Sequence, residues 1–187
     1  MSAVNKNSCA TISGLSYSLC ESNMGGIKSI LLANRDDVES ITTASTSSSI
    51  SANCITAIDM ASGKTFQEFT IRKGTCGFES NLQINDNGTS YVQTDLSIVL
   101  RRMDSNKRMA MNALILGEVY AIVVDANNSA WLLGFDEAVT CTAGQGSTGV
   151  GKSDANQYTL TLTDTSLEYP FELTTEALND AKGIDNL

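Results

Sequence analysis

Short alternations of apolar and polar residues run through most of the chain and predict β-strands. Residues 27–33 (IKSILLA) follow Gly25 and Gly26 and form a β-branched and aliphatic run bounded by turn residues, which favours a strand over a helix. Residues 158–163 (YTLTLT) alternate with a period of two, as a strand buried on one face does. Residues 167–173 supply a last predicted strand before a polar tail.

Three further pairs of strands are expected to form hairpins, because turn residues separate the two members of each pair. The predicted hairpins are 54–60 with 66–73, 78–84 with 91–100, and 119–124 with 130–135. The second pair, joined across the Asn85-Asp-Asn-Gly88 turn, gives the clearest β signal. In these segments Phe66, Phe69, Ile71 and Trp131 are predicted to pack in the core rather than to bind a ligand.

One segment carries a helical pattern. Met111, Leu114 and Ile115 share one face of residues 106–116, Asp104 and Ser105 precede the segment as cap residues, and Gly117 follows it. The sequence therefore predicts one substantial helix.

Together these patterns predict a mainly β fold, an antiparallel β-sandwich or barrel with one flanking α-helix, formed by a single domain over residues 1–187. Three parts are expected to lie outside the packed elements: an N-terminal arm (1–24), a flexible Ser/Thr-rich loop (41–53) and a polar C-terminal tail (174–187). A Gly/Ser loop is expected over 144–153. No apolar run approaches the length needed to cross a bilayer, and residues 1–20 lack the pattern of an export signal, so neither a membrane nor secretion is expected.

The charge balance argues against a nucleic-acid-gripping surface. The chain has a formal charge of −9 and a sequence pI near 4.4, with 12 basic against 21 acidic residues. Because affinity for nucleic acid depends largely on Lys and Arg that neutralise phosphates, tight binding to DNA is not expected. The same charge suits a wall past which DNA slides, although many acidic proteins are acidic for solubility alone.

Much familiar catalysis is excluded by composition. Histidine is absent, which removes Ser-His and Cys-His nucleophilic pairs, histidine zinc sites and histidine pH switches. The five cysteines are widely and irregularly spaced without a CxxC pair, and they are expected to be reduced thiols that pack as small apolar side chains. No catalytic pair of carboxylates is assigned, and the sequence predicts a protein that is not an enzyme.

Two short motifs could carry chemistry. Residues 146–153 (GSTGVGKS) fit the phosphate-loop pattern GxxxxGK[ST] through Gly146, Gly151, Lys152 and Ser153. That chemistry requires a strand before the loop and a helix after it, whereas the strand pattern of 158–163 follows here, so the match is interpreted as accidental. The less favoured alternative is a nucleotide-binding protein.

The second motif echoes a calcium loop. Asp125, Asn127, Ser129 and Asp136 have oxygen donors at suggestive spacing, but Ala130 stands where such a loop uses glycine, and the flanking segments are predicted strands. A plain β-turn is the favoured interpretation. No cofactor and no metal are predicted.

The order and spacing of the segments resemble tail tube and tail hub proteins of crAss-like and related Bacteroidales phages. The segments that carry the resemblance are CESNMGGIKSILLANRDDV, TFQEF, TSYVQTDLSIVLRRMDSNKR, IVVDANNSAWLLG and YTLTLTD, in that order. The resemblance spans nearly the whole chain and rests on this order, because no single segment is diagnostic.

The resemblance implies a virion structural protein, made in the host cytoplasm, whose copies join sheet edges into a ring, usually hexameric, or into stacked rings through which DNA passes during ejection. It also implies contacts with other tail proteins, and it places the hairpin 78–100 along or beside the channel. The residues expected at subunit contacts are Thr42, Ser45, Ser48, Phe78, Leu82, Tyr91 and Leu96. A short-tail hub or adaptor ring is the alternative that the sequence leaves open.

Overall fold

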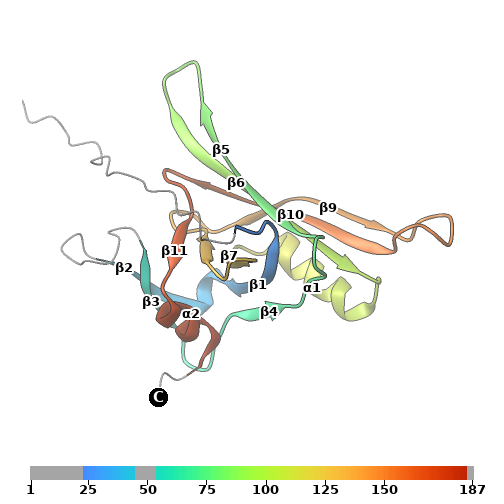
Figure 1. Cartoon of the computed structure of the whole chain (residues 1–187), viewed down its shortest axis with the longest axis horizontal. Coiled ribbons are helices and arrows are strands. Elements are labelled where there is room, and N and C mark those ends of the chain that lie inside the picture. Colours follow the sequence, from blue (N-terminus) through green and yellow to red (C-terminus); the bar gives the residue numbers. More distant parts are fainter. Residues whose placement is uncertain (1–22, 45–53, 185–187) are drawn as a thin grey trace, which may run out of the picture.

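The computed structural model describes residues 23–44 and 54–184. These residues form two β-sheets packed face to face (Figure 1). One helix packs on each face of the larger sheet. The larger sheet has the order β2-β3-β11-β8-β7-β1-β4, and the smaller sheet has the order β5-β6-β10-β9. The strands of the larger sheet are β1 (Ile27–Asn34), β2 (Val38–Thr43), β3 (Ile55–Met60), β4 (Gln67–Phe69), β7 (Val119–Asp125), β8 (Ala130–Leu133) and β11 (Phe171–Leu173). The strands of the smaller sheet are β5 (Gly77–Ile84), β6 (Ser90–Arg101), β9 (Thr140–Ser147) and β10 (Gln157–Ser166).

The predicted fold class is confirmed at the level of a mainly β sandwich, and three details differ. The sheets stay separate and form no closed barrel within the described residues. Among the strands that the structure describes, every pair is antiparallel except β3 with β11, which makes the larger sheet mixed. One flanking helix was predicted, but the described part has two, α1 (Ser105–Leu116) and α2 (Thr175–Lys182), besides a short 3-10 turn (Arg35–Asp37).

The central strands of the larger sheet carry apolar residues at successive positions. Because successive side chains of a strand point to opposite faces, both faces of this sheet are buried. In β7, Ala121 and Val123 face the smaller sheet, whereas Ile122 and Val124 pack toward α2. The core between the sheets is completed by β6 and β10 and by Met111 of α1. These contacts hold β6 and β10 of the smaller sheet against the larger sheet.

Helix α1 follows its predicted pattern with one exception. The Asp104 carboxylate accepts a hydrogen bond from the Lys107 amide (2.8 Å), which caps the first turn as expected. Met111 and Leu114 are buried, but Ile115 is exposed. Neither helix in the described part of the chain is long and apolar enough to span a membrane.

The hairpin predicted for 54–60 with 66–73 is wrong. Lys64 does close a turn onto the Ala61 carbonyl, but β3 then pairs with β2, and β4 pairs with β1 on the far edge of the sheet. The chain is diverted at Phe66, whose side chain is buried in the α2-side core and whose amide donates to the Ala181 carbonyl. Burial of one aromatic side chain outweighs the local preference for a hairpin.

The expected C-terminal tail 174–187 contains helix α2 instead. Thr174 Oγ1 accepts a hydrogen bond from the Ala177 amide, and Gly183 closes the helix in the left-handed conformation (φ 66°). Ala177 and Ala181 are fully buried against the larger sheet. Only residues 185–187 of that range lie outside the described part.

The expected loops are shorter than predicted. Residues 41–43 of the Ser/Thr-rich segment belong to β2, because pairing with β3 holds the backbone whatever the side chains are. Residues 144–147 of the Gly/Ser segment likewise belong to β9 and pair with β10. The last predicted strand, 167–173, is reduced to β11. Residues 1–22 of the predicted arm and 45–53 of the predicted loop lie outside the described residues.

Candidate assembly surface

The smaller sheet has two free edges within the described part of the chain, β5 on one side and β9 on the other. Its two hairpins extend in different directions beyond the packed body, β5–β6 toward the top and β9–β10 toward the right of Figure 1. A sheet edge carries unpaired N–H and C=O groups that another strand can complete. These two edges therefore offer a place for another chain to add.

The hydrogen bonds fix which β5 amides face the free edge. The Asn85 amide donates to the Thr89 carbonyl (2.9 Å), so residues 85 and 89 form a hydrogen-bonded pair of the antiparallel ladder. Such pairs alternate along the ladder, which directs the amides of odd-numbered β5 residues to β6. The amides of the even-numbered residues, among them Ser80 and Leu82, therefore point out to the free edge.

The same reasoning extends across the sheet to β9. The Arg102 amide donates to the Asn156 carbonyl (2.7 Å), which continues the β6–β10 ladder with even-numbered pairs bonded. Odd-numbered residues of β10 then bond to β9, where Thr159 faces Gln145. The amides of Gly144 and Gly146 consequently point to the free edge of β9.

The side of the smaller sheet that faces away from the core, here called the outward face, is polar and nearly free of basic residues. Hydroxyl and amide side chains dominate it, with Glu79 and Asp95 as its acids and Arg101 as the one basic residue at its strand positions. Its members are Glu79, Asn81, Gln83, Tyr91, Gln93, Asp95, Ser97, Val99, Arg101, Thr140, Thr142, Ala143, Gln145, Ser147, Gln157, Thr159, Thr161, Thr163 and Thr165.

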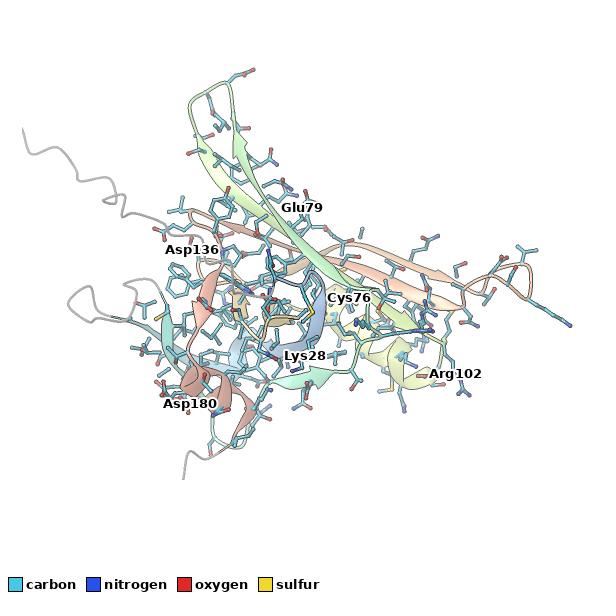
Figure 2. The ribbon with its side chains drawn as sticks, viewed as in Figure 1. Lys28, Cys76, Glu79, Arg102, Asp136 and Asp180 are labelled. Atoms are coloured by element: carbon cyan, nitrogen blue, oxygen red, sulfur yellow. The ribbon has the colours of Figure 1, made fainter. Side chains whose placement is uncertain are left out.

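The two acids of the outward face lie opposite each other. Glu79 on β5 pairs with Asp95 on β6, and Glu79 is visible on the projecting hairpin in Figure 2. Thr163 Oγ1 donates to Asp95 Oδ1 (2.6 Å) and Gln93 Nε2 donates to Asp95 Oδ2 (3.0 Å), which ties three strand positions into one hydrogen-bonded row. Like charges directly opposite in a sheet are unfavourable, and here only Asp95 is compensated by these donors.

The opposite side of the β5–β6 hairpin changes from core to surface along its length. Phe78 is half-buried against the core, but Leu82 and Ile84, further along the same side of β5, are 53% and 72% exposed. The hairpin thus presents apolar side chains where it passes the end of the core. These residues add apolar area beside the free edge of β5.

The residues predicted at subunit contacts are spread over several environments. Leu82 is exposed at the β5 edge, Tyr91 is half-buried on the outward face, and Thr42 is exposed on β2, the edge strand of the other sheet. Leu96 has no exposed surface, because it is part of the monomer core, and it is removed from the candidates. Ser45 and Ser48 lie outside the described residues.

The phosphate-loop residues lie at the end of the β9–β10 hairpin. Gly146 is in β9, and Lys152 and Ser153 are in the connection that leads directly into β10, so a strand and not a helix follows them. The Val150 and Gly151 amides both donate to Asp154 Oδ2 (2.8 and 2.7 Å), and these hydrogen bonds lower the pKa of that carboxyl. An internal carboxylate already occupies the amides that a phosphate would need.

The calcium-like segment forms the turn between β7 and β8. Asp125 Oδ1 accepts hydrogen bonds from the amides of Asn127 and Ser129 (2.8 and 2.9 Å), the pattern of an Asx turn. Trp131 is half-buried, and its Nε1 donates to Asp125 Oδ2 (3.4 Å). Asp136 is held elsewhere, where it accepts from the Leu167 amide. No group of three or more acidic or cysteine side chains in the described residues is placed to hold a metal ion.

Comparison of the chain with family models, with curated proteins and with solved structures gives no match. The candidate surface therefore rests on the chain's own geometry. Sequence reasoning found the β5 side of it through the alternation in 78–84 and 91–100. It missed strand β9, because residues 140–147 are rich in threonine and glycine and have no apolar alternation that would predict a strand.

Proposed function

We propose that the chain is the repeating subunit of a ring or tube in a phage tail, a structural part of the virion and not an enzyme. The observation that carries this proposal is a four-stranded antiparallel sheet with two different free edges, β5 and β9. Two different edges on one subunit allow head-to-tail pairing, which produces a closed ring where the rotation between neighbours is suitable. A hexamer is the form expected from the sequence resemblance.

In the proposed ring, β5 of one copy pairs with β9 of the next, so the smaller sheets join into one continuous wall. Unpaired amides on both edges supply the new main-chain hydrogen bonds. The exposed Leu82 and Ile84 would be covered by the neighbouring copy, which adds apolar burial to that pairing. The larger sheet and both helices would form the outer part of the ring.

The outward face would line the bore. Its hydroxyl and amide side chains offer few cations to hold phosphates, and Glu79 and Asp95 repel them. DNA would therefore slide past this wall without specific binding. The virion tail is the proposed location, and the neighbouring tail proteins are the proposed partners. A hub that forms a single ring would use the same edges, and the length of the assemblies distinguishes it from a stacked tube.

The first test is size-exclusion chromatography with light scattering, followed by negative-stain microscopy of the full chain. Rings or tubes with a central hole are expected, and a monomer at all concentrations would contradict the proposal. The second test removes one edge amide with Leu82→Pro or Gly144→Pro, because an edge position whose amide faces solvent tolerates proline in the monomer. Leu82→Ala and Gly144→Ala keep the amide and serve as matched controls. Assembly should fail in both proline variants, whereas Gly144→Ala should assemble normally and Leu82→Ala, which loses apolar burial but keeps the amide, should assemble more weakly.

A further inference from the structure

Helix α1 carries an exposed apolar surface close to the free edge of β9. Met111 and Leu114 point inward and are buried, but Met109, Ile115 and Leu116 are 68%, 50% and 89% exposed. Met109 and Leu116 are seven residues apart and therefore share one face of the helix, with Ile115 on its flank. These three residues are here called the α1 surface. Exposed apolar residues that gather in this way mark a surface for a partner.

The helix lies on the core side of the smaller sheet and runs along β9 (Figure 1). Just before its first turn, Met103 Cε lies 3.2 Å from the position that a Cβ on Gly146 would take. Just after its last turn, Val119 exchanges two backbone hydrogen bonds (3.1 and 2.8 Å) with Val139, the residue that precedes β9. The C-terminal end of α1, which carries two of the three residues of the α1 surface, therefore lies beside the start of β9.

A neighbouring β5 would reach β9 in the antiparallel direction. Each strand of the smaller sheet runs opposite to the next, so β5 and β9 of one copy run in opposite directions. Rotation about an axis close to the strand direction keeps this relation between neighbouring copies. The end of β5 that carries Leu82 and Ile84 then points toward the start of β9, beside the C-terminal end of α1.

The faces of the two strands also match. The amides that point to the free edges belong to even-numbered residues in both strands, among them Leu82 on β5 and Gly144 on β9. Hydrogen-bonded partners of an antiparallel pair project to the same face of the sheet. Gly144 lies opposite Leu160, whose side chain is in the core, so Leu82 and Ile84 of the neighbour fall on the core side, where α1 lies. Gly144 and Gly146 have no side chains that would separate them from the helix.

We propose that the α1 surface binds Leu82 and Ile84 of the neighbouring copy in the assembled ring. This inference rests on the proposed pairing of β5 with β9, and it names the surface that covers the apolar side of the hairpin. Burial of the two apolar surfaces against each other stabilises the pairing, because main-chain hydrogen bonds that replace hydrogen bonds to water add little by themselves.

The test uses the two edge-blocked variants, because their mixture isolates a single interface. The Leu82→Pro copy supplies β9 and the α1 beside it, and the Gly144→Pro copy supplies β5 with Leu82 and Ile84. Leu116→Ala in the Leu82→Pro copy should raise the dissociation constant of the mixed dimer by roughly tenfold, measured by sedimentation velocity. The same change in the Gly144→Pro copy is the matched control. It should leave the dissociation constant unchanged, because that α1 lies beside the blocked edge.

A second pair of substitutions identifies what Leu116 contacts. With Leu82→Ala and Ile84→Ala in the Gly144→Pro copy, Leu116→Ala in the other copy should weaken the dimer by less than about threefold further. A dissociation constant that Leu116→Ala leaves unchanged, an equal weakening from either copy, or a full effect without the Leu82 and Ile84 side chains would overturn the contact while the pairing of the edges stands. A mixture that forms no dimer would contradict the pairing itself, and this inference with it.

Discussion

Glu79 and Asp95 face each other across the β5–β6 pair on the outward face, two carboxylates at directly opposed positions. Thr163 and Gln93 donate to Asp95, but no donor to Glu79 is observed among the described residues. The opposed pair costs the subunit stability and places two negative charges side by side on the outward face. It suits the proposed bore.

Glu79→Gln should stabilise the subunit, because it removes the like-charge contact and keeps the shape of the side chain. The expected gain in the free energy of unfolding is about 0.5 kcal/mol, measured by urea denaturation. Glu68→Gln, at an exposed position of β4 that pairs with Leu31, is the control and should change little. A loss of stability in Glu79→Gln would contradict the repulsion described above.

Charge reversal on the outward face should make assembled particles retain DNA. Glu79→Lys combined with Asp95→Lys places four more positive charge units on the proposed wall of the bore, and retention should fall steeply with added salt. Co-sedimentation of particles with double-stranded DNA measures this. Glu68→Lys with Glu176→Lys makes the same charge change away from that face and is the control. Equal retention by both double variants would argue that the outward face does not line the bore.

Truncation of Leu96 and of Leu82 should have different effects on stability, because Leu96 lies in the core and Leu82 at the surface. Leu96→Ala removes a fully buried side chain and should cost about 2–5 kcal/mol of unfolding free energy. Leu82→Ala, at a half-exposed position, should cost the isolated subunit less than about 0.5 kcal/mol. Denaturation curves of both variants, taken at a concentration where the subunits are dissociated, give the comparison. Similar costs would contradict the placement of β5 beyond the core.

The pH dependence of stability should report Asp164. Burial raises the pKa of its carboxyl, and the nearby Asp136 and Glu137 raise it further against the opposing amide of Gly134. The native state therefore keeps this proton to a higher pH than the unfolded state does. The protonated Asp164 carboxyl therefore contributes stability that is fully present below the ordinary aspartate pKa. This contribution is lost as the pH rises through the raised pKa of Asp164 in the native state. Asp164→Asn should remove that loss, so its midpoint should exceed the native one near neutral pH and approach it in acid.

Gly183 should resist substitution, because it ends α2 at φ 66° and an added Cβ would lie 2.6 Å from Thr65 Cγ2. Gly183→Ala should cost about 1 kcal/mol or more. The control is Gly25→Ala, where no atom lies within 4 Å of the added Cβ. Calorimetric unfolding of the two variants distinguishes them, and equal midpoints would be inconsistent with a close contact between α2 and Thr65.

The parts of the fold that the sequence predicted are those in which side-chain periodicity matches the structure. For this reason strands β6 and β10 and the cap at Asp104 could be predicted from the sequence. Helix α2 escaped prediction because its buried face consists of the small residues Ala177 and Ala181. Strand β9 escaped because glycine main chain pairs with β10 without an apolar pattern.

The candidate sites were harder to predict from the sequence, because they depend on strand register and on contacts between distant segments. The hydrogen bond from the Asn85 amide to the Thr89 carbonyl fixes which residue pairs of β5 and β6 are hydrogen-bonded. This alternation determines which β5 amides face the free edge. Asp164 did leave a signal, since it shares the period-two face of Leu160 and Leu162, two fully or nearly fully buried residues. The pocket that Asp164 lines, however, is formed together by Leu132, Phe135 and Asp136 and by residues 166–171, and no local sequence pattern reveals it.

The central claim, that β5 of one copy pairs with β9 of the next, is tested most directly by mixing two variants that cannot assemble alone. Leu82→Pro blocks the β5 edge and Gly144→Pro blocks the β9 edge, so each variant keeps the edge that the other has lost. Light scattering of an equimolar mixture should show a dimer with one subunit of each kind, whereas each variant alone should remain a monomer. Dimers of either variant by itself, or a mixture that stays monomeric, would contradict head-to-tail pairing of these two edges.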